Sequence, residues 1–218
     1  MRNVGYLLSA TFVLLFSGSS YAQGWFEYVN QTDRFSVNFP GEPEVQEFEY
    51  NSEFEAVFPA RNYAVQIGAN RYSAVVVDFT DSARIHAEME KTEAASGPTN
   101  WLYDQRASVA RAAREFRQRD AEVTYDAWSH IDRVEGHQMQ LTNADGSRTF
   151  AGIYLNGNAN RLYVLEATVA PGSPPPIQFQ QSLRFLDEEG ERIRYLLSTN
   201  GCALDPDDPA VMGTLSGR

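Results

Sequence analysis

The residues best suited to acid–base or metal chemistry in this sequence are its three histidines, His86, His130 and His137. His130 and His137 flank Glu135-Gly136, which we interpret as a turn, so their imidazoles could meet across paired strands, with Asp132 nearby. Two histidines without a ligand spacing do not define a zinc site, which needs three or four ligands in a supported geometry. We assign no metal, but a hydrolytic or metal-dependent enzyme that uses His130 and His137 stays open as an alternative.

No motif for nucleophilic, phosphate or cofactor chemistry occurs in the chain. The segment Gly213–Gly217 contains Ser216, but no residue separates Ser216 from Gly217, so it does not have the spacing of a G-x-S-x-G nucleophile elbow. Neither G-x-G-x-x-G nor G-x-x-x-x-G-K-[ST] is present. We therefore predict no catalytic residue, no cofactor and no enzymatic activity.

The clearest charge anomaly is a band of arginines in a chain whose net charge is −11 at pH 7. The band holds Arg106, Arg111, Arg114, Arg117 and Arg119. It could bind an acidic partner, an anionic lipid surface or another polyanion, or it could be a solvated helix face whose arginines pair with nearby acids. We take Arg106, Arg111, Arg114 and Arg117 as candidate partner-binding residues, and we expect no nucleic-acid partner.

The first 22 residues have the three parts of a secretory signal. Arg2 precedes an apolar run from about Val4 to Phe16, and Ser20-Tyr21-Ala22 is a small-x-small cleavage site. The apolar run is too short to cross a bilayer comfortably, and we find no transmembrane segment in the remainder. We therefore expect cleavage after Ala22 and a periplasmic or secreted protein. The single cysteine, Cys202, cannot form an internal disulfide, and its role stays open.

Three strand-like segments form a predicted meander at residues 136–142, 148–155 and 161–169, each with alternating or β-branched apolar residues. The turn between the first two contains Gly146, which accepts a positive φ. After Pro174-Pro175-Pro176, the spacing of Phe179, Leu183 and Leu186 predicts a short helix that docks on the sheet.

The segment Ala74–Val77 is apolar on both faces and therefore needs cover on both sides of its sheet. Two predicted helices, from Asp81 to about Ala95 and from about Asn100 to Arg119, can supply such cover. Further strands are predicted at residues 25–29, 35–39, 63–67 and 72–79, and Gly68-Ala-Asn70 between the last two is a hairpin signal. A long or interrupted strand is predicted from Glu122 to Val134. The predicted fold is α+β, an antiparallel sheet flanked by helices on both faces in an α/β/α sandwich. One domain is expected over residues 23–190, followed by a C-terminal extension over 191–218.

The segment Glu42–Glu55 holds six glutamates and no basic residue. It could be an exposed recognition loop that carries negative charge. Alternatively it is an edge strand whose charges keep an exposed backbone from pairing with other chains.

Three short stretches resemble the PsbP-like superfamily, also called the Mog/PsbP fold, including exported bacterial members. They are Phe35-Ser-Val-Asn-Phe-Pro-Gly-Glu-Pro43, Asn160-Arg-Leu-Tyr-Val-Leu165 and Phe179-Gln-Gln-Ser-Leu-Arg-Phe185. The resemblance implies an antiparallel sheet with helices on both sides and a non-enzymatic binding or accessory role, and it transfers no functional residue. The expected function is that of an exported non-catalytic protein that engages a protein or envelope component. The alternative is an envelope hydrolase or metal-dependent enzyme that uses His130 and His137.

Overall fold

The structure is a computed structural model that describes residues 24–90, 97, 99–157 and 159–193. The signal-like segment 1–22, Cys202 and residues 194–218 of the extension lie outside the described residues. The strands are β1 (Phe26–Asn30), β2 (Phe35–Phe39), β3 (Glu44–Asn51), β4 (Val57–Ile67), β5 (Asn70–Asp78), β6 (Ala121–Ile131), β7 (Val134–Asn143), β8 (Arg148–Asn156), β9 (Arg161–Val169) and β10 (Arg184–Phe185). The helices are α1 (Ser82–Glu88), α2 (Asn100–Arg117) and α3 (Ile177–Gln180).

The centre of the fold is a seven-stranded antiparallel sheet in the order β3-β4-β5-β9-β8-β7-β6. The predicted meander is confirmed as β7–β8–β9, and the hairpin predicted around Gly68 is confirmed as β4–β5. Gly68 takes the positive φ of 59° that this tight turn requires. The acidic segment supplies β3, which lies at one edge of the sheet, and β6 lies at the other.

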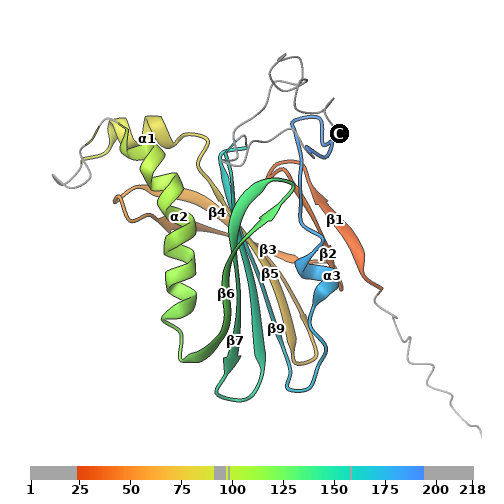
Figure 1. The fold of residues 1–218 in the computed structure, drawn as a ribbon. Coiled ribbons are helices and arrows are strands. Elements are labelled where there is room, and N and C mark those ends of the chain that lie inside the picture. Colours follow the sequence, from red (N-terminus) through yellow and green to blue (C-terminus); the bar gives the residue numbers. More distant parts are fainter. Residues whose placement is uncertain (1–23, 91–96, 98, 158, 194–218) are drawn as a thin grey trace, which may run out of the picture.

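Helix α2 covers one face of this sheet. Its buried stripe includes Val109, Ala113 and Phe116, which share a core cluster with Met139 of β7 and Ile153 of β8. Figure 1 shows α2 lying along this face. Its period of 3.6 residues places these side chains on the sheet and leaves most of the arginines outside it.

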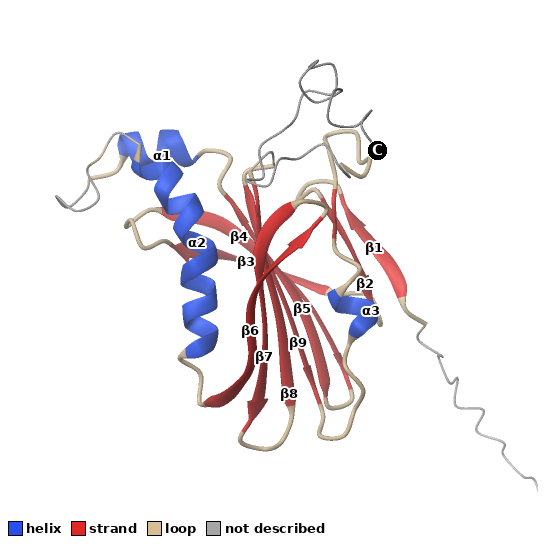
Figure 2. Cartoon of the chain, viewed as in Figure 1, coloured by secondary structure: helices blue, strands red, loops and turns tan. Residues whose placement is uncertain are grey.

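The opposite face is covered mainly by a second sheet, so the prediction of helices on both faces is wrong. This smaller antiparallel sheet has the order β1-β2-β10, and Figures 1 and 2 show it with α3 on the side of the large sheet away from α2. Phe35, Val37 and Phe39 alternate along β2 and are fully buried against the large sheet. Because that alternation has the period of a strand, a strand pair provides the cover that Ala74 and Val76 need on this side.

The helices also differ from their predicted bounds. Helix α1 ends at Glu88, and Asp81 makes no capping hydrogen bond but forms an ion pair with Arg84 at 2.7 Å. Helix α3 has four residues instead of the longer predicted helix, because Leu183 and Phe185 continue as alternating buried residues into β10. None of the described helices combines the length and the apolar character needed to cross a bilayer.

Asp33, in the turn between β1 and β2, links the small sheet to the large one through hydrogen bonds. Its side chain is completely buried, and its carboxylate accepts hydrogen bonds from Arg61 and from the Tyr63 hydroxyl, both on β4. The hydroxyl of Tyr163 on β9 donates to the Asp33 carbonyl at 2.8 Å. Burial and then the hydrogen bond to Asp33 raise the pKa of Tyr63 well above its ordinary value. A buried carboxylate of this kind requires its partners, since an unpaired buried charge is costly.

We predict that Asp33→Asn lowers the free energy of unfolding by about 3 kcal/mol, because it replaces the buried carboxylate on which Arg61 and Tyr63 converge and leaves Arg61 only its exposed partner Glu47. Urea denaturation followed by circular dichroism measures this change. The control is Asp81→Asn, which removes an exposed ion pair and should change stability by less than about 1 kcal/mol. Equal effects of the two substitutions would contradict the anchoring role of Asp33.

Candidate functional site

The β6–β7 hairpin turns through Asp132 and Arg133, whose φ values are 48° and 69°. Ile131 and Val134 pair across this two-residue turn, so the turn lies before the Glu135-Gly136 position at which it was predicted. As a result His130 pairs with Glu135, and His137 pairs with Trp128. The two histidines lie on one face of the hairpin but do not face each other across the strands.

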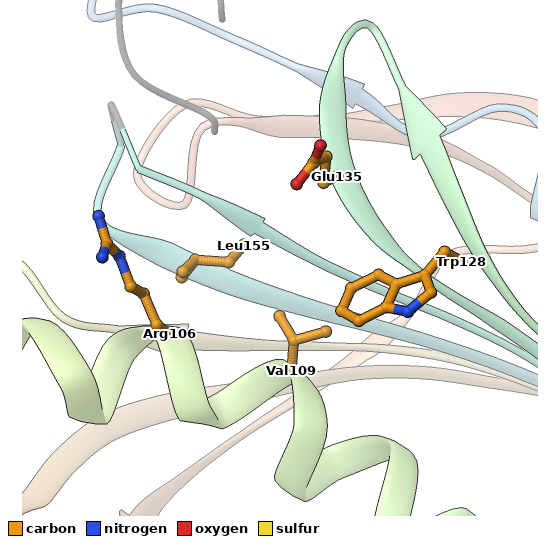
Figure 3. Close-up of a pocket in the computed structure, with 5 residues that line it drawn as sticks. All are labelled: Arg106, Val109, Trp128, Glu135 and Leu155. Carbon is orange, nitrogen blue, oxygen red and sulfur yellow. The ribbon is translucent and has the colours of Figure 1, made fainter. Parts of the chain in front are cut away.

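A groove lies between α2 and this hairpin, and we call it the Trp128 groove. Its volume is about 330 Å³, and it is lined by Arg106 and Val109 of α2, Trp128 of β6, Glu135 of β7 and Leu155 of β8. Figure 3 shows the Trp128 ring and Val109 lying toward each other, with Arg106 and Glu135 at the sides. An apolar floor with a few charged groups around it is typical of a binding site.

Trp128 is the most unusual residue of this surface. It is 72% exposed, although it has the largest apolar side chain of any residue type. The edge of its ring system meets the His137 ring, with centroids 5.2 Å apart and an interplanar angle of 71°. Trp128 also lines a neighbouring hollow, together with Ser129, His130 and Glu135. An exposed aromatic side chain that lines two hollows indicates a surface for interaction.

Beneath Trp128, a cluster of three side chains links α2 to the hairpin. The Arg117 guanidinium donates two hydrogen bonds to Asp126, at 2.6 Å and 3.0 Å. Asp126 also contacts Nε2 of His137, and the same Nε2 lies 3.2 Å from Nη2 of Arg117. The hydrogen bonds from Arg117 lower the pKa of Asp126 to about 2, burial opposes this, and the bond from His137 adds to it. Asp126 is therefore an anion at neutral pH.

Within the part of the chain that the structure describes, the arginines of the band form ion pairs or hydrogen bonds with other residues of this chain, except for Arg106. Arg111 donates to the carbonyl of Asn51, and Arg114 forms an ion pair with Glu53, so both hold the segment between β3 and β4. Arg119 pairs with Glu166 of β9 through two bonds, at 2.7 Å and 2.9 Å. Among the described residues, exposed Arg106 has no ion-pair partner. Three of the four candidate partner-binding arginines are therefore engaged within the chain, and the binding role of all four stays a prediction.

The histidines have three different environments. His86 is buried, and its Nε2 lies 3.0 Å from the buried carboxylate of Asp104, a contact that joins α1 to α2. Burial raises the pKa of Asp104, while hydrogen bonds from Ser52 and His86 oppose the shift. His137 is buried under Trp128, and His130 is exposed. No group of three or more metal-ligating side chains occurs within the described part of the chain.

Sequence reasoning found the two sides of this site but missed its centre. Arg106, Arg117, His130 and His137 were selected by charge and residue type, whereas Trp128 was treated as an ordinary strand residue. A signal was present, because Trp128 alternates with the polar residues Asp126 and His130 along the strand. A large aromatic residue in such a segment is either buried by a partner element or left exposed for binding.

No known protein family matches the chain by sequence, and no curated protein does. Among solved structures, the chain is similar to the solution structure of cyanobacterial PsbP (CyanoP) from Synechocystis sp. PCC 6803. The TM-score is 0.43 at 10% sequence identity, and the match covers 77% of this chain and 95% of the other. A likeness of this degree concerns the fold alone and supports no statement about family or function.

We predict that Asp126→Asn lowers the free energy of unfolding at pH 7 by about 1 kcal/mol, a modest value because solvent screens the partly exposed pair. The pKa of Asp126 is lowered in the folded state, so its contribution is present above the ordinary carboxyl pKa and is lost as the pH falls toward 2. The difference between the parent protein and the variant should therefore shrink between pH 7 and pH 2.

Urea denaturation at both pH values measures this difference. The matched control is Glu122→Gln, an exposed carboxylate of the same strand that has no ion pair within the described region. A difference for Asp126→Asn that persists undiminished at pH 2 would contradict the assigned ion pair.

Proposed function

We propose that the protein is an exported, non-catalytic binding or accessory protein that engages a protein or envelope component through the Trp128 groove. The observation that carries this proposal is the 72% exposure of Trp128 beside an arginine that has no ion-pair partner in the described residues. Tryptophan and arginine are the side chains most enriched at the energetic centres of protein interfaces. The export part rests on the signal-like residues 1–22.

The support of the indole favours binding over an incidental exposed side chain. His137 packs against the ring, and Arg117 and Asp126 hold His137 from two elements. A side chain held in place before a partner arrives loses less conformational entropy on binding. The groove therefore offers a partly ordered apolar surface of the kind that a folded or extended partner can cover.

The arrangement around His137 favours a non-catalytic role over the hydrolase alternative. A general base needs a ring nitrogen within hydrogen-bond reach of the nucleophile or water that it deprotonates. Both Arg117 and Asp126 engage Nε2 of His137, and no hydrogen bond joins His137 to a hydroxyl or thiol group of the described residues. We therefore assign this cluster to positioning Trp128.

To test the proposal, Trp128 is replaced by a photoreactive phenylalanine derivative, and the protein is cross-linked inside cells. We expect an adduct of discrete mass, since a bound partner would cover this position. Adding Arg106→Glu should reduce the yield of this adduct about fivefold, because the substitution reverses the charge on one side of the groove.

Two matched variants control for surface exposure and for charge. The photoreactive residue at Phe48, an aromatic on the opposite edge strand that is 39% exposed, should give no such adduct. Arg71→Glu makes the same charge change at another exposed position and should leave the Trp128 adduct intact. Equal cross-linking from positions 128 and 48, or none from position 128, would contradict binding of a partner at the Trp128 groove.

A further inference from the structure

The outer edge of β6 has backbone groups whose direction follows from the hairpin turn. A two-residue turn with positive φ at both positions is closed by a pair that exchanges backbone hydrogen bonds, here Ile131 and Val134. Hydrogen-bonded and non-hydrogen-bonded pairs then alternate along an antiparallel ladder. Asp126, Trp128 and His130 therefore direct their N–H and C=O groups away from β7, toward the edge at which no described strand pairs with β6.

The same three residues also present their side chains to the face that α2 covers. Asp126 pairs with Met139, whose side chain lies in the core beneath α2, and Trp128 lines the Trp128 groove. Side chains at alternate positions share one face of a strand, so His130 belongs to this face as well. Open backbone groups and an exposed aromatic side chain thus coincide at one place.

The two edges of the large sheet are built differently. Strand β3 carries Glu44, Glu47 and Glu49, like charges that discourage pairing with another strand. In β6 the register shifts between Val123 and Tyr125, a bulge that interrupts pairing at that end. From Tyr125 to Ile131 the only carboxylate is Asp126, and Arg117 neutralises it. Within the described residues, this half of β6 has no proline, no bulge and no unpaired carboxylate, the features that usually protect an exposed edge.

We propose that the partner engages the Trp128 groove with an extended peptide segment, which pairs with the outer edge of β6 as an additional strand. The inference rests on the proposed function and specifies its binding mode. Backbone hydrogen bonds to Asp126, Trp128 and His130 supply affinity, and alternate side chains of the segment enter the groove. An edge strand beside a helix is a suitable receptor because the helix forms the wall against which those side chains pack.

The residues of the groove define the chemistry of the segment. An apolar side chain covers Trp128 and Val109, and Leu155 completes that apolar surface. An acidic side chain pairs with Arg106, the exposed arginine of α2 that has no ion-pair partner among the described residues. Basic segments are disfavoured at that position by like-charge repulsion. Glu135 lines the groove as well and repels a carboxylate on its own side. The partner segment is therefore an extended peptide whose face toward the groove has apolar residues and an acidic residue placed at Arg106.

The test uses a phage-displayed library of random peptides of about nine residues, a length that spans a typical strand. Selection is carried out on the purified protein, and selected peptides are synthesised and titrated. We expect peptides whose binding requires Trp128 and weakens with Arg106→Glu. His130→Pro removes an outward N–H at an edge position where proline is tolerated, and it should weaken binding about tenfold relative to His130→Ala.

A second measurement does not depend on the folding of the proline variant. Single N-methylation along the bound peptide should abolish binding at every second residue and leave the intervening residues unaffected, because only alternate amides face β6. A Trp128-dependent peptide that tolerates both His130→Pro and N-methylation throughout would overturn strand addition and leave the proposed binding groove standing. Selection that yields no Trp128-dependent peptide would count against the proposed function itself.

Discussion

The large sheet is apolar on both faces, and the rest of the fold follows from the need to cover both. On β5 alone, Ala74 and Val76 face one core cluster and Val77 faces the other. The small sheet and α3 cover the face of Ala74 and Val76, and α2 covers the opposite face by packing against β7, β8 and β9. One helix cannot cover seven strands, so the edge strand β6 extends beyond it. The groove is the space left at that boundary.

Ion pairs fix the width of that space. Arg117 and Arg119, at the C-terminal end of α2, bind Asp126 of β6 and Glu166 of β9, and Arg114 binds Glu53 near β3. The helix is thus tied to separate strands of the same sheet. Such partly exposed pairs contribute little stability individually, but together they fix where the helix lies. The arginine band therefore acts largely within the chain, where it sets the position of the groove.

Local patterns predicted the strands well because alternation and turn residues are encoded in neighbouring positions. β9 was predicted at its observed bounds, and the Gly68 hairpin and the edge position of the acidic segment were also anticipated. What covers a face is a long-range property, so Phe35–Phe39 was recognised as a strand but not as part of a second sheet. The same limit applies to the site, because the sequence does not show that α2 lies beside Trp128 and forms the groove with it. The Asp132–Arg133 turn was missed because it contains no glycine and because arginine is not a usual positive-φ residue.

The central claim is that the β6 edge is open along the groove in the isolated protein. Residue-resolved amide hydrogen exchange by nuclear magnetic resonance tests it most directly. Tyr125, Ala127, Ser129 and Ile131 donate to β7 and should exchange slowly, whereas Asp126, Trp128 and His130 should exchange fast. Uniform slow exchange along the strand would contradict the account, because it would mean that the edge is already paired.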